Sequence, residues 1–178
     1  MKTIKPLPVH IIANIPYHIS APLIQHIVTY KQHVKTCTLM VQKEFADKCL
    51  ANPNTKTYTS FSIFCQYHFK IEKGFTVKKR CFYPVPKVDS YVLKFMPKAP
   101  LLNPQDEELL FKLIKASFWA RRKQMITCLL KNPYTPYPES IKTLPFFKEN
   151  SQIRAESCQL ADLIQLSKEI KSLQEPNY

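Results

Sequence analysis

The tetrapeptide Asn14-Ile15-Pro16-Tyr17 places an amide, a proline and an aromatic ring next to one another. These residue types suit chemistry on the exocyclic amine of adenine, N6, whose lone pair is delocalised into the ring and is therefore a poor nucleophile. Two fixed hydrogen-bond acceptors can localise that lone pair toward an incoming carbon. The Asn14 side-chain oxygen is a candidate for one acceptor. The Ile15 carbonyl is a candidate for the other, because Pro16 restricts the residue before it and donates no hydrogen bond. Tyr17 offers a ring on which an extruded base can stack.

The residues around the tetrapeptide predict where it lies in the fold. The apolar run over residues 9–13 is typical of a buried strand, and Ser20-Ala21-Pro22 opens a segment with helical spacing of its apolar residues. The tetrapeptide would then follow the carboxyl end of a strand in an α/β unit, where open α/β sheets bind their ligands. The alternative is an ordinary turn at a strand end, and the placement favours the ligand site.

A second segment, residues 78–90, has the composition of a loop that binds nucleic acid. It opens with three basic residues, Lys78, Lys79 and Arg80. An aromatic pair and two prolines follow them. A rigid loop with basic flanks can present Phe82 as the second face of a base clamp, with Lys87 near a phosphate. The alternative is a proline-stiffened hairpin with Phe82 in its core.

The remaining patterns predict an α/β fold followed by helices. Residues 35–41 and 45–50 predict a strand and a helix, which favours parallel pairing with the first strand. Residues 59–67 are interpreted as a helix. Residues 68–77 and 90–96 predict an antiparallel pair that closes one edge of the sheet.

The character of the sequence changes after a proline-containing linker at residues 97–100. Asn103-Pro104 is typical of a helix start, and apolar stripes predict helices up to residue 131 and over residues 159–173. We therefore predict an α/β domain over residues 1–98, which the resemblance described below identifies as part of a Rossmann-like domain, and a small all-α domain over residues 101–178.

The charge balance predicts a polyanionic partner. The chain has 178 residues with 26 Lys and Arg against 13 Asp and Glu, a formal net charge of +13. The first 100 residues hold 15 basic and 4 acidic side chains, a difference of +11, so the excess is concentrated there. Nucleic acid is favoured over a membrane surface as the partner.

Several classes of site are excluded by what the sequence lacks. No run of about 18 apolar residues is present, so we predict no membrane span. The six cysteines form no C-x-x-C pair and have no histidine at zinc spacing, which indicates reduced thiols and no metal. Gly74 is the single glycine, so a glycine-rich nucleotide loop is missing. We expect a cytoplasmic monomer.

Several blocks of the sequence resemble the ribosomal RNA adenine N6,N6-dimethyltransferase family. In the first part of the chain they are residues 14–20, 41–46 and 82–90. In the helical part they are Phe118-Trp119-Ala120-Arg121-Arg122-Lys123 and Arg154-Ala155-Glu156. The resemblance covers nearly all of the chain. The most similar branch comprises the bacterial enzymes that dimethylate two adjacent adenosines near the 3′ end of 16S rRNA.

The resemblance implies a fold, a cofactor and a partner. The fold is the C-terminal half of a Rossmann-like class I methyltransferase sheet followed by a small all-α domain. S-adenosylmethionine is the methyl donor, with Asn14 at the edge of its site, and the partner is 16S rRNA in a small-subunit precursor. The catalytic motif corresponds to Asn14–Tyr17, and the second stacking ring to Phe82. The resemblance also implies three RNA contacts, Arg121, Arg122 and Lys123.

Two other functions stay open at this point. One is an erythromycin-resistance-type methylase acting on adenine of 23S rRNA, and the other is a non-catalytic factor that binds rRNA during ribosome assembly. For the basic block at residues 121–123, the alternative is a solvated helix end.

The sequence departs from the family at its beginning. The resemblance implies that about half of the sheet precedes the tetrapeptide, with a glycine-rich loop and a carboxylate for the cofactor ribose. The acidic residues of the first 100 positions all follow the tetrapeptide: Glu44, Asp47, Glu72 and Asp89. We therefore expect the C-terminal part of such an enzyme, as a fragment, a split reading frame or a shortened gene product.

This departure predicts that the chain alone neither binds S-adenosylmethionine well nor methylates RNA. Without a carboxylate for the ribose hydroxyls, most of the contacts that hold such a cofactor are missing. Isothermal titration calorimetry of the isolated chain should give no saturable heat at micromolar cofactor. A dissociation constant in the micromolar range would overturn the expectation.

Overall fold

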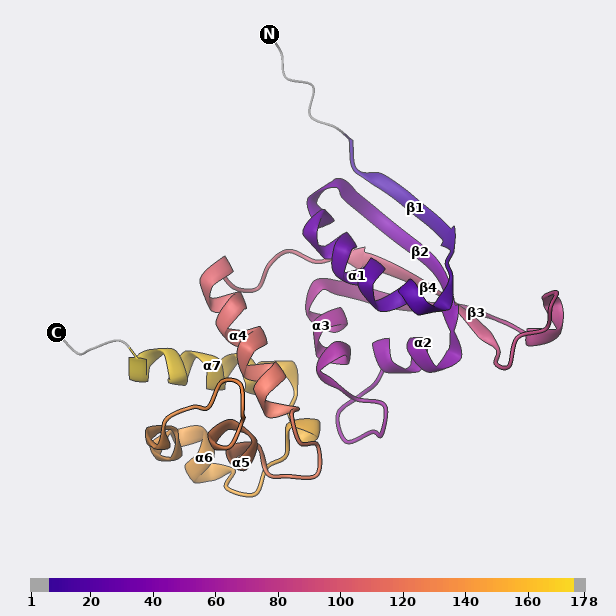
Figure 1. Cartoon of the computed structure of the whole chain (residues 1–178). Helices are drawn as coiled ribbons and strands as arrows, with labels where there is room; N and C mark the ends of the chain where they lie inside the picture. Colours follow the sequence, from indigo (N-terminus) through magenta and orange to yellow (C-terminus); the bar gives the residue numbers. More distant parts are fainter. Residues whose placement is uncertain (1–6, 175–178) are drawn as a thin grey trace, which may run out of the picture. The chain divides into compact units, whose positions relative to one another are not determined.

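The computed structural model describes residues 7–174 and divides the chain into two compact units (Figure 1). The first unit comprises Met1–Leu50 and Phe64–Ala99, and the second comprises Ala51–Ile63 and Pro100–Tyr178. Residues 51–63, which fall inside the first predicted domain, thus pack with the helical unit. The reason is Tyr58, which is 2% exposed and donates its hydroxyl to the Cys158 carbonyl at 2.9 Å.

The first unit is built on one mixed sheet. Its strands are β1 (Val9–Asn14), β2 (Val34–Gln42), β3 (Phe69–Val77) and β4 (Ser90–Pro97). The strand order is β1-β2-β4-β3, with β1 parallel to β2 and with β4 antiparallel to both of its neighbours. The predicted parallel pair and the predicted antiparallel pair at one edge are both confirmed. Helix α1 (Ser20–Thr29) connects the two parallel strands.

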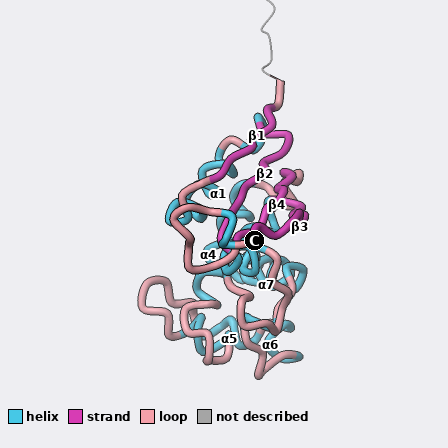
Figure 2. Tube along the Cα trace, turned by 90° about the vertical axis from the view of Figure 1, so that its right-hand side faces the viewer, coloured by secondary structure: helices cyan, strands magenta, loops and turns pink. Residues whose placement is uncertain are grey.

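One face of this sheet carries the core. The buried side chains alternate along the two central strands: Cys37, Leu39 and Val41 from β2, and Tyr91, Leu93 and Phe95 from β4. Figures 1 and 2 show α1 beside one face of the sheet, and α2 (Lys43–Cys49) packs on β2 and β4. Helix α3 (Ser60–His68), predicted over residues 59–67, is also confirmed. The α/β class is therefore confirmed.

The prediction of a buried first strand is wrong. Val9 is 53% exposed and Ile12 is 83% exposed, so β1 presents apolar side chains to solvent. The physical reason is its position, because β1 lies at the edge of the sheet and pairs with β2 alone among the described residues. An apolar run shows that a strand could be buried. Whether it is buried depends on the strands and helices that pack beside it in the fold.

The second unit is helical. Its helices are α4 (Pro104–Ser117), α5 (Met125–Leu130), α6 (Pro145–Glu149) and α7 (Leu160–Gln174). The predicted start at Asn103 is confirmed, since its Oδ1 accepts a hydrogen bond from the Asp106 backbone N–H at 2.9 Å and Pro104 follows it. Leu110 and Leu113 of α4 are fully buried, as are Leu163 and Leu166 of α7. Between residues 7 and 174 no helix combines the length and apolarity needed to cross a membrane.

His68, at the junction of α3 and β3, is a buried histidine with a lowered pKa. Its side chain is 2% exposed and its Nδ1 lies 3.3 Å from Lys31 Nζ. Its ring makes edge-on contacts with Phe64 and Tyr67. Burial, followed by the charges of Lys31 and Lys98, lowers the pKa of His68 from 6.5 to about 4. The folded chain therefore holds this imidazole neutral at pH 7.

The lowered pKa of His68 predicts that stability depends on pH. Between pH 6.5 and pH 4 the unfolded chain binds a proton at this residue and the folded chain does not. The free energy of unfolding should therefore fall as pH is lowered through this window, by up to about 1.4 kcal/mol per pH unit. Urea unfolding followed by circular dichroism measures this slope, and His68→Gln should flatten it. The exposed His33→Gln is the control, and an equal slope in the parent and in His68→Gln would contradict the prediction.

Candidate functional site

The two predicted site segments begin at the same edge of the sheet. Asn14, the last residue of β1, lies opposite Met40 of β2 in the parallel register. Gln42, the last residue of β2, lies opposite Ser90, the first residue of β4. The tetrapeptide and the loop between β3 and β4 therefore both adjoin the carboxyl end of β2. That is the edge at which α/β sheets bind ligands.

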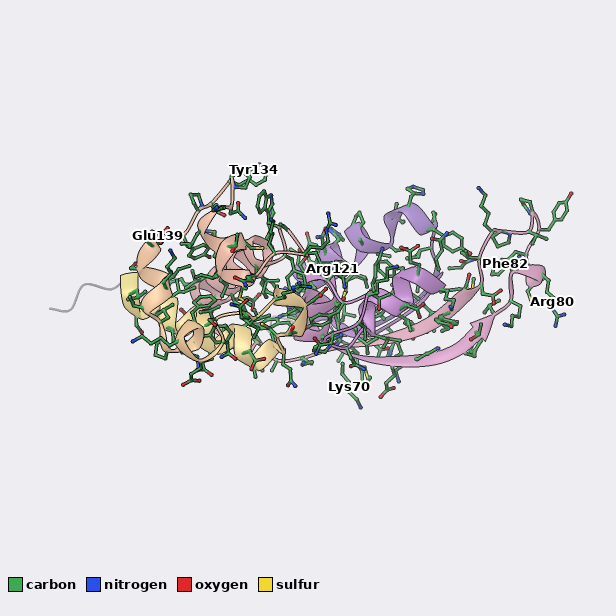
Figure 3. The ribbon with its side chains drawn as sticks, turned by 90° about the horizontal axis from the view of Figure 1, so that it is seen from below. Lys70, Arg80, Phe82, Arg121, Tyr134 and Glu139 are labelled. Carbon is green, nitrogen blue, oxygen red and sulfur yellow. The ribbon has the colours of Figure 1, made fainter. Side chains whose placement is uncertain are left out.

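A cavity joins the two segments. Its volume is about 380 Å³, and its lining residues are Asn14, Ile15, Pro16, Tyr17, Phe82, Tyr83, Pro84 and Pro86. The structure thus brings together all four residues of the tetrapeptide and Phe82, which are 65 or more positions apart in the sequence. The volume lies in the range of small-ligand sites. Figure 3 shows Phe82 and Arg80 on the loop that projects beyond the strands.

The tetrapeptide is anchored at Ile15 and open on both sides of it. Ile15 is 7% exposed, whereas Asn14 and Pro16 are exposed. Pro16, with φ −57° and ψ 133°, is extended, and a short 3₁₀ turn over Tyr17–Ile19 follows it. Among the residues that the structure describes, the Asn14 side chain has no hydrogen-bond partner. Asn14 lines the cavity, and its side-chain oxygen is therefore available to accept a hydrogen bond from a ligand.

A hydrogen bond fixes the Tyr17 ring. The Tyr17 hydroxyl lies 2.9 Å from the Ser90 hydroxyl, and the Ser90 side chain is fully buried. Ser20 Oγ also donates to the Tyr17 carbonyl at 2.9 Å. Tyr17 is half-buried, so part of its ring remains on the cavity. This arrangement fits a stacking surface whose orientation is set before a ligand binds.

Asp89 holds the base of the loop. Its carboxylate accepts a hydrogen bond from the Lys79 backbone N–H at 2.9 Å and pairs with the Lys78 ammonium at 3.2 Å. Its carbonyl oxygen accepts from the Lys43 backbone N–H at 3.0 Å, which ties the loop to α2. The Lys79 N–H and then the Lys78 ammonium lower the pKa of Asp89. The carboxylate is therefore ionised at neutral pH and closes the loop.

Asp89 and Ser90 were not assigned a role from the sequence. The role of Asp89 could have been predicted, because a short acidic side chain at the end of a loop that opens with lysines can bond to their backbone N–H and ammonium groups. The partner of Ser90 lies 73 residues away, and nothing in the local pattern indicates it. Of the other lining residues, Tyr83 was noted only as part of an aromatic pair, and Pro84 and Pro86 only as residues that stiffen the loop. The Tyr83–Pro84 peptide bond is cis.

The basic residues of the loop differ in their availability. Lys78 is engaged with Asp89. Three others are exposed and have no ion-pair partner among residues 7–174: Lys79, Arg80 and Lys87. Exposed cations with no carboxylate partner are the type of residue that contacts phosphate.

Arg121 lies in the helical unit, and its side chain is hydrogen-bonded to residues of the same unit. Its Nε donates to Glu156 at 2.7 Å, and its guanidinium donates to the carbonyl oxygens of Thr55 and Lys56 at 2.9 and 2.5 Å. It thereby ties residues 55–56 to the turn before α7. Its neighbours Arg122 and Lys123 are exposed.

The described residues fit a base better than they fit a nucleoside cofactor. A cofactor with a ribose needs a carboxylate for its hydroxyls at the strand ends. The carboxylates of the first unit pair with lysines: Glu44 with Lys48, Asp47 with Lys43, Glu72 with Lys70, and Asp89 with Lys78. None of them lines the cavity. The described part of the chain also holds no group of three or more potential metal ligands.

Comparisons with known proteins agree on one family. The family model described as ribosomal RNA adenine dimethylase matches residues 4–172. The chain is 38% identical over 162 residues to the ribosomal RNA small subunit methyltransferase A of Protochlamydia amoebophila, covering 91% of this chain and 56% of that protein. It is 37% identical to the protein of the same name from Streptococcus thermophilus, covering 90% and 57%. The chain thus spans a little more than half of the length of these relatives.

Solved structures support the same fold. A dimethyladenosine transferase from Plasmodium falciparum superimposes with a TM-score of 0.78 at 27% identity, covering 96% of this chain and 70% of that one. The 23S rRNA methyltransferase ErmE superimposes with a TM-score of 0.67 at 22% identity, covering 94% and 67%, a likeness of fold alone.

The contacts of Arg121 predict a contrast with its neighbour. Arg121→Ala removes a charge-assisted pair and leaves Glu156 and two carbonyl oxygens without their donor. It should lower the free energy of unfolding by about 1.5–3 kcal/mol. The exposed Arg122→Ala is the matched control and should change it by less than about 0.5 kcal/mol. Equal stabilities of the two variants in urea unfolding would show that Arg121 does not anchor the unit.

Proposed function

The chain belongs to the ribosomal RNA adenine dimethylase family, and from this premise we propose that it forms the adenine-binding part of an rRNA adenine N6,N6-dimethyltransferase. The substrate is the pair of adjacent adenosines near the 3′ end of 16S rRNA in a small-subunit precursor, and the methyl donor is S-adenosylmethionine. One observation carries the proposal: the cavity is lined by the whole tetrapeptide and by Phe82.

Binding of the base uses the two rings on the cavity. A target adenosine leaves its stack and enters between Tyr17 and Phe82, which come from the two segments that line the cavity. Each base that stacks on an aromatic side chain gains about 1–3 kcal/mol. The hydrogen bond from Tyr17 to Ser90 keeps one ring in place, so less conformational entropy is lost on binding.

Activation of the amine uses two acceptors beside the rings. The unused Asn14 side-chain oxygen and the Ile15 carbonyl accept the two N6 hydrogens. The N6 amine then becomes more tetrahedral. Its lone pair is localised on the nitrogen and is directed out of the plane of the base, toward the methyl donor. Because Ile15 is buried and Pro16 restricts the backbone beside it, the Ile15 carbonyl is oriented before the base arrives, and Asn14 is carried on the last residue of β1. Such preorganised polar groups are the usual source of rate acceleration.

Contacts with phosphate use the exposed cations. In the first unit Lys79, Arg80 and Lys87 flank the stacking loop, with Lys78 held beside them by Asp89. In the helical unit we propose Arg122 and Lys123 as contacts and assign Arg121 to anchoring. A protein with these contacts and a net charge of +13 should bind RNA less tightly as salt concentration rises.

The small-subunit substrate is favoured over 23S rRNA. The Protochlamydia amoebophila and Streptococcus thermophilus relatives, at 38% and 37% identity, are small-subunit methyltransferases. The 23S rRNA methyltransferase ErmE is similar in fold alone. A cytoplasmic location and action as a monomer complete the proposal. A non-catalytic assembly factor is the second candidate, because the four carboxylates of the first unit pair with lysines and none of them lines the cavity.

The proposal predicts the effect of Asn14→Ala on methyl transfer. Because the chain spans about half of its relatives, the assay uses it fused behind the preceding part of the Protochlamydia amoebophila protein. The substrate is small-subunit RNA that lacks the modification, and primer extension locates dimethylated adenosines. Asn14→Ala should slow methylation about 10²- to 10³-fold, the typical effect of losing one preorganised hydrogen-bonding group.

The matched control for this assay is His10→Ala, which is also exposed on β1 and does not line the cavity. Its rate should equal that of the parent fusion. Full dimethylation by Asn14→Ala would refute the base-clamp assignment. Modification of 23S rRNA instead of 16S rRNA would support the erythromycin-resistance-type methylase as the function. A folded fusion that binds RNA and transfers no methyl group would favour the assembly factor.

A further inference from the structure

We propose that the helical unit carries a second RNA-binding site, which holds one unpaired nucleotide on Trp119 and Tyr134. This site lies apart from the Asn14 cavity in the chain, and it does not depend on the role of that cavity. Its lining residues all fall between positions 112 and 135, within one compact unit.

The site is a cavity of about 430 Å³ at the end of α4. Its lining residues are Lys112, Lys115, Ala116, Trp119, Asn132, Tyr134 and Thr135. Helix α4 supplies one wall, and the loop that follows α5 supplies the other. The volume falls within the range of sites for small ligands, which is about 300–1,000 Å³. A base with its ribose fits such a space.

Two large aromatic side chains at this cavity are exposed. Tyr134 is 82% exposed and Trp119 is 46% exposed. Figure 3 shows Tyr134 at the tip of its loop. A tyrosine and a tryptophan that share one open cavity have apolar faces left without a partner, and the faces of bases stack on such rings whatever their sequence.

The loop that carries Tyr134 is held in place. Asn132 is 5% exposed, and its Oδ1 accepts hydrogen bonds from the backbone N–H groups of Tyr134 at 2.9 Å and Thr135 at 3.1 Å. The exposed ring is therefore presented by an ordered turn. A preorganised ring loses less entropy when a base stacks on it.

The charge at the cavity favours an anion. Lys112 and Lys115 are both exposed on α4, and no carboxylate lines the cavity. Lys112 also pairs with Glu108 at 2.8 Å, whereas Lys115 has no ion-pair partner in the part of the chain that the structure describes. A lysine ammonium is a compact charge suited to phosphate. Two rings and two lysines together match a nucleotide, whereas an acidic peptide would leave the rings unused.

The test uses the fluorescence of Trp119. It is the single tryptophan of the chain, so its emission reports on this cavity directly. The full chain is titrated with a hexa-adenylate RNA at low salt, and stacking of a base should quench the emission in a saturable way. Tyr134→Ala should weaken binding fivefold or more, the change that corresponds to losing one stacked base. Lys115→Glu should weaken it to a similar degree.

Matched control variants distinguish this site from the general effect of removing an exposed ring or reversing an exposed charge. Tyr30→Ala removes an aromatic ring that is 51% exposed in the other unit, and Lys148→Glu makes the same charge change at an exposed position of α6. Both should bind within twofold of the parent. Asn14→Ala should quench like the parent, so a failure at one site leaves the other assignment intact. The altered side chains of Tyr134 and Lys115 are exposed, and circular dichroism checks that both variants fold.

Three results would overturn the proposal. One is the absence of quenching by RNA. Another is unchanged binding by both Tyr134→Ala and Lys115→Glu. The third is equal quenching by a poly-glutamate peptide that competes with the RNA, which would make this a site for acidic peptides.

Discussion

The hydrogen bond between the Tyr17 and Ser90 hydroxyls is the contact on which the proposed base site depends. It joins residues 73 positions apart, one after the first strand of the sheet and one at the start of β4. Because β1 runs parallel to β2 and β4 runs antiparallel to it, the ends of β1 and β2 and the start of β4 lie at one edge of the sheet. The rigid tetrapeptide and the projecting loop then share a cavity with an unused amide oxygen and two rings on its walls. Neither segment alone could clamp a base.

Much of this site was predictable because its chemistry is local. The amide, the following proline and the aromatic ring lie in four consecutive residues, and Phe82 stands in a loop that is conspicuous for its prolines and cations. The pairing of strands was predictable too, since a helix between two short apolar runs favours a parallel pair. What the sequence could not show is how exposed Ile12 is. An apolar run reports what a strand can bury, whereas exposure depends on the elements beside it.

Contacts between distant residues were also beyond the sequence. Arg121 stands in a basic block that is typical of RNA contact, yet its guanidinium is occupied by Glu156 and by the carbonyl oxygens of residues 55–56. Tyr58 similarly draws its segment into the helical unit through Cys158. Charge patterns indicate which residue types are available for a partner. Only the fold decides which of them are already used. Of the seven cations predicted from the sequence to contact RNA, those that are exposed and have no ion-pair partner among the described residues are Lys79, Arg80, Lys87, Arg122 and Lys123.

The central claim is that Asn14 accepts a hydrogen bond from N6 of adenine while the rings stack on the base. The most direct measurement is the NMR signal of the Asn14 side-chain amide, assigned by its loss in Asn14→Ala. It is recorded with a short RNA containing one unpaired adenosine and with the same RNA containing purine riboside, which stacks but lacks the amine. The account predicts that the Asn14 signal shifts with adenosine and stays in place with purine riboside, while ring signals of Tyr17 shift with both. Equal shifts of the Asn14 signal with the two RNAs, or no shift with either, would contradict it.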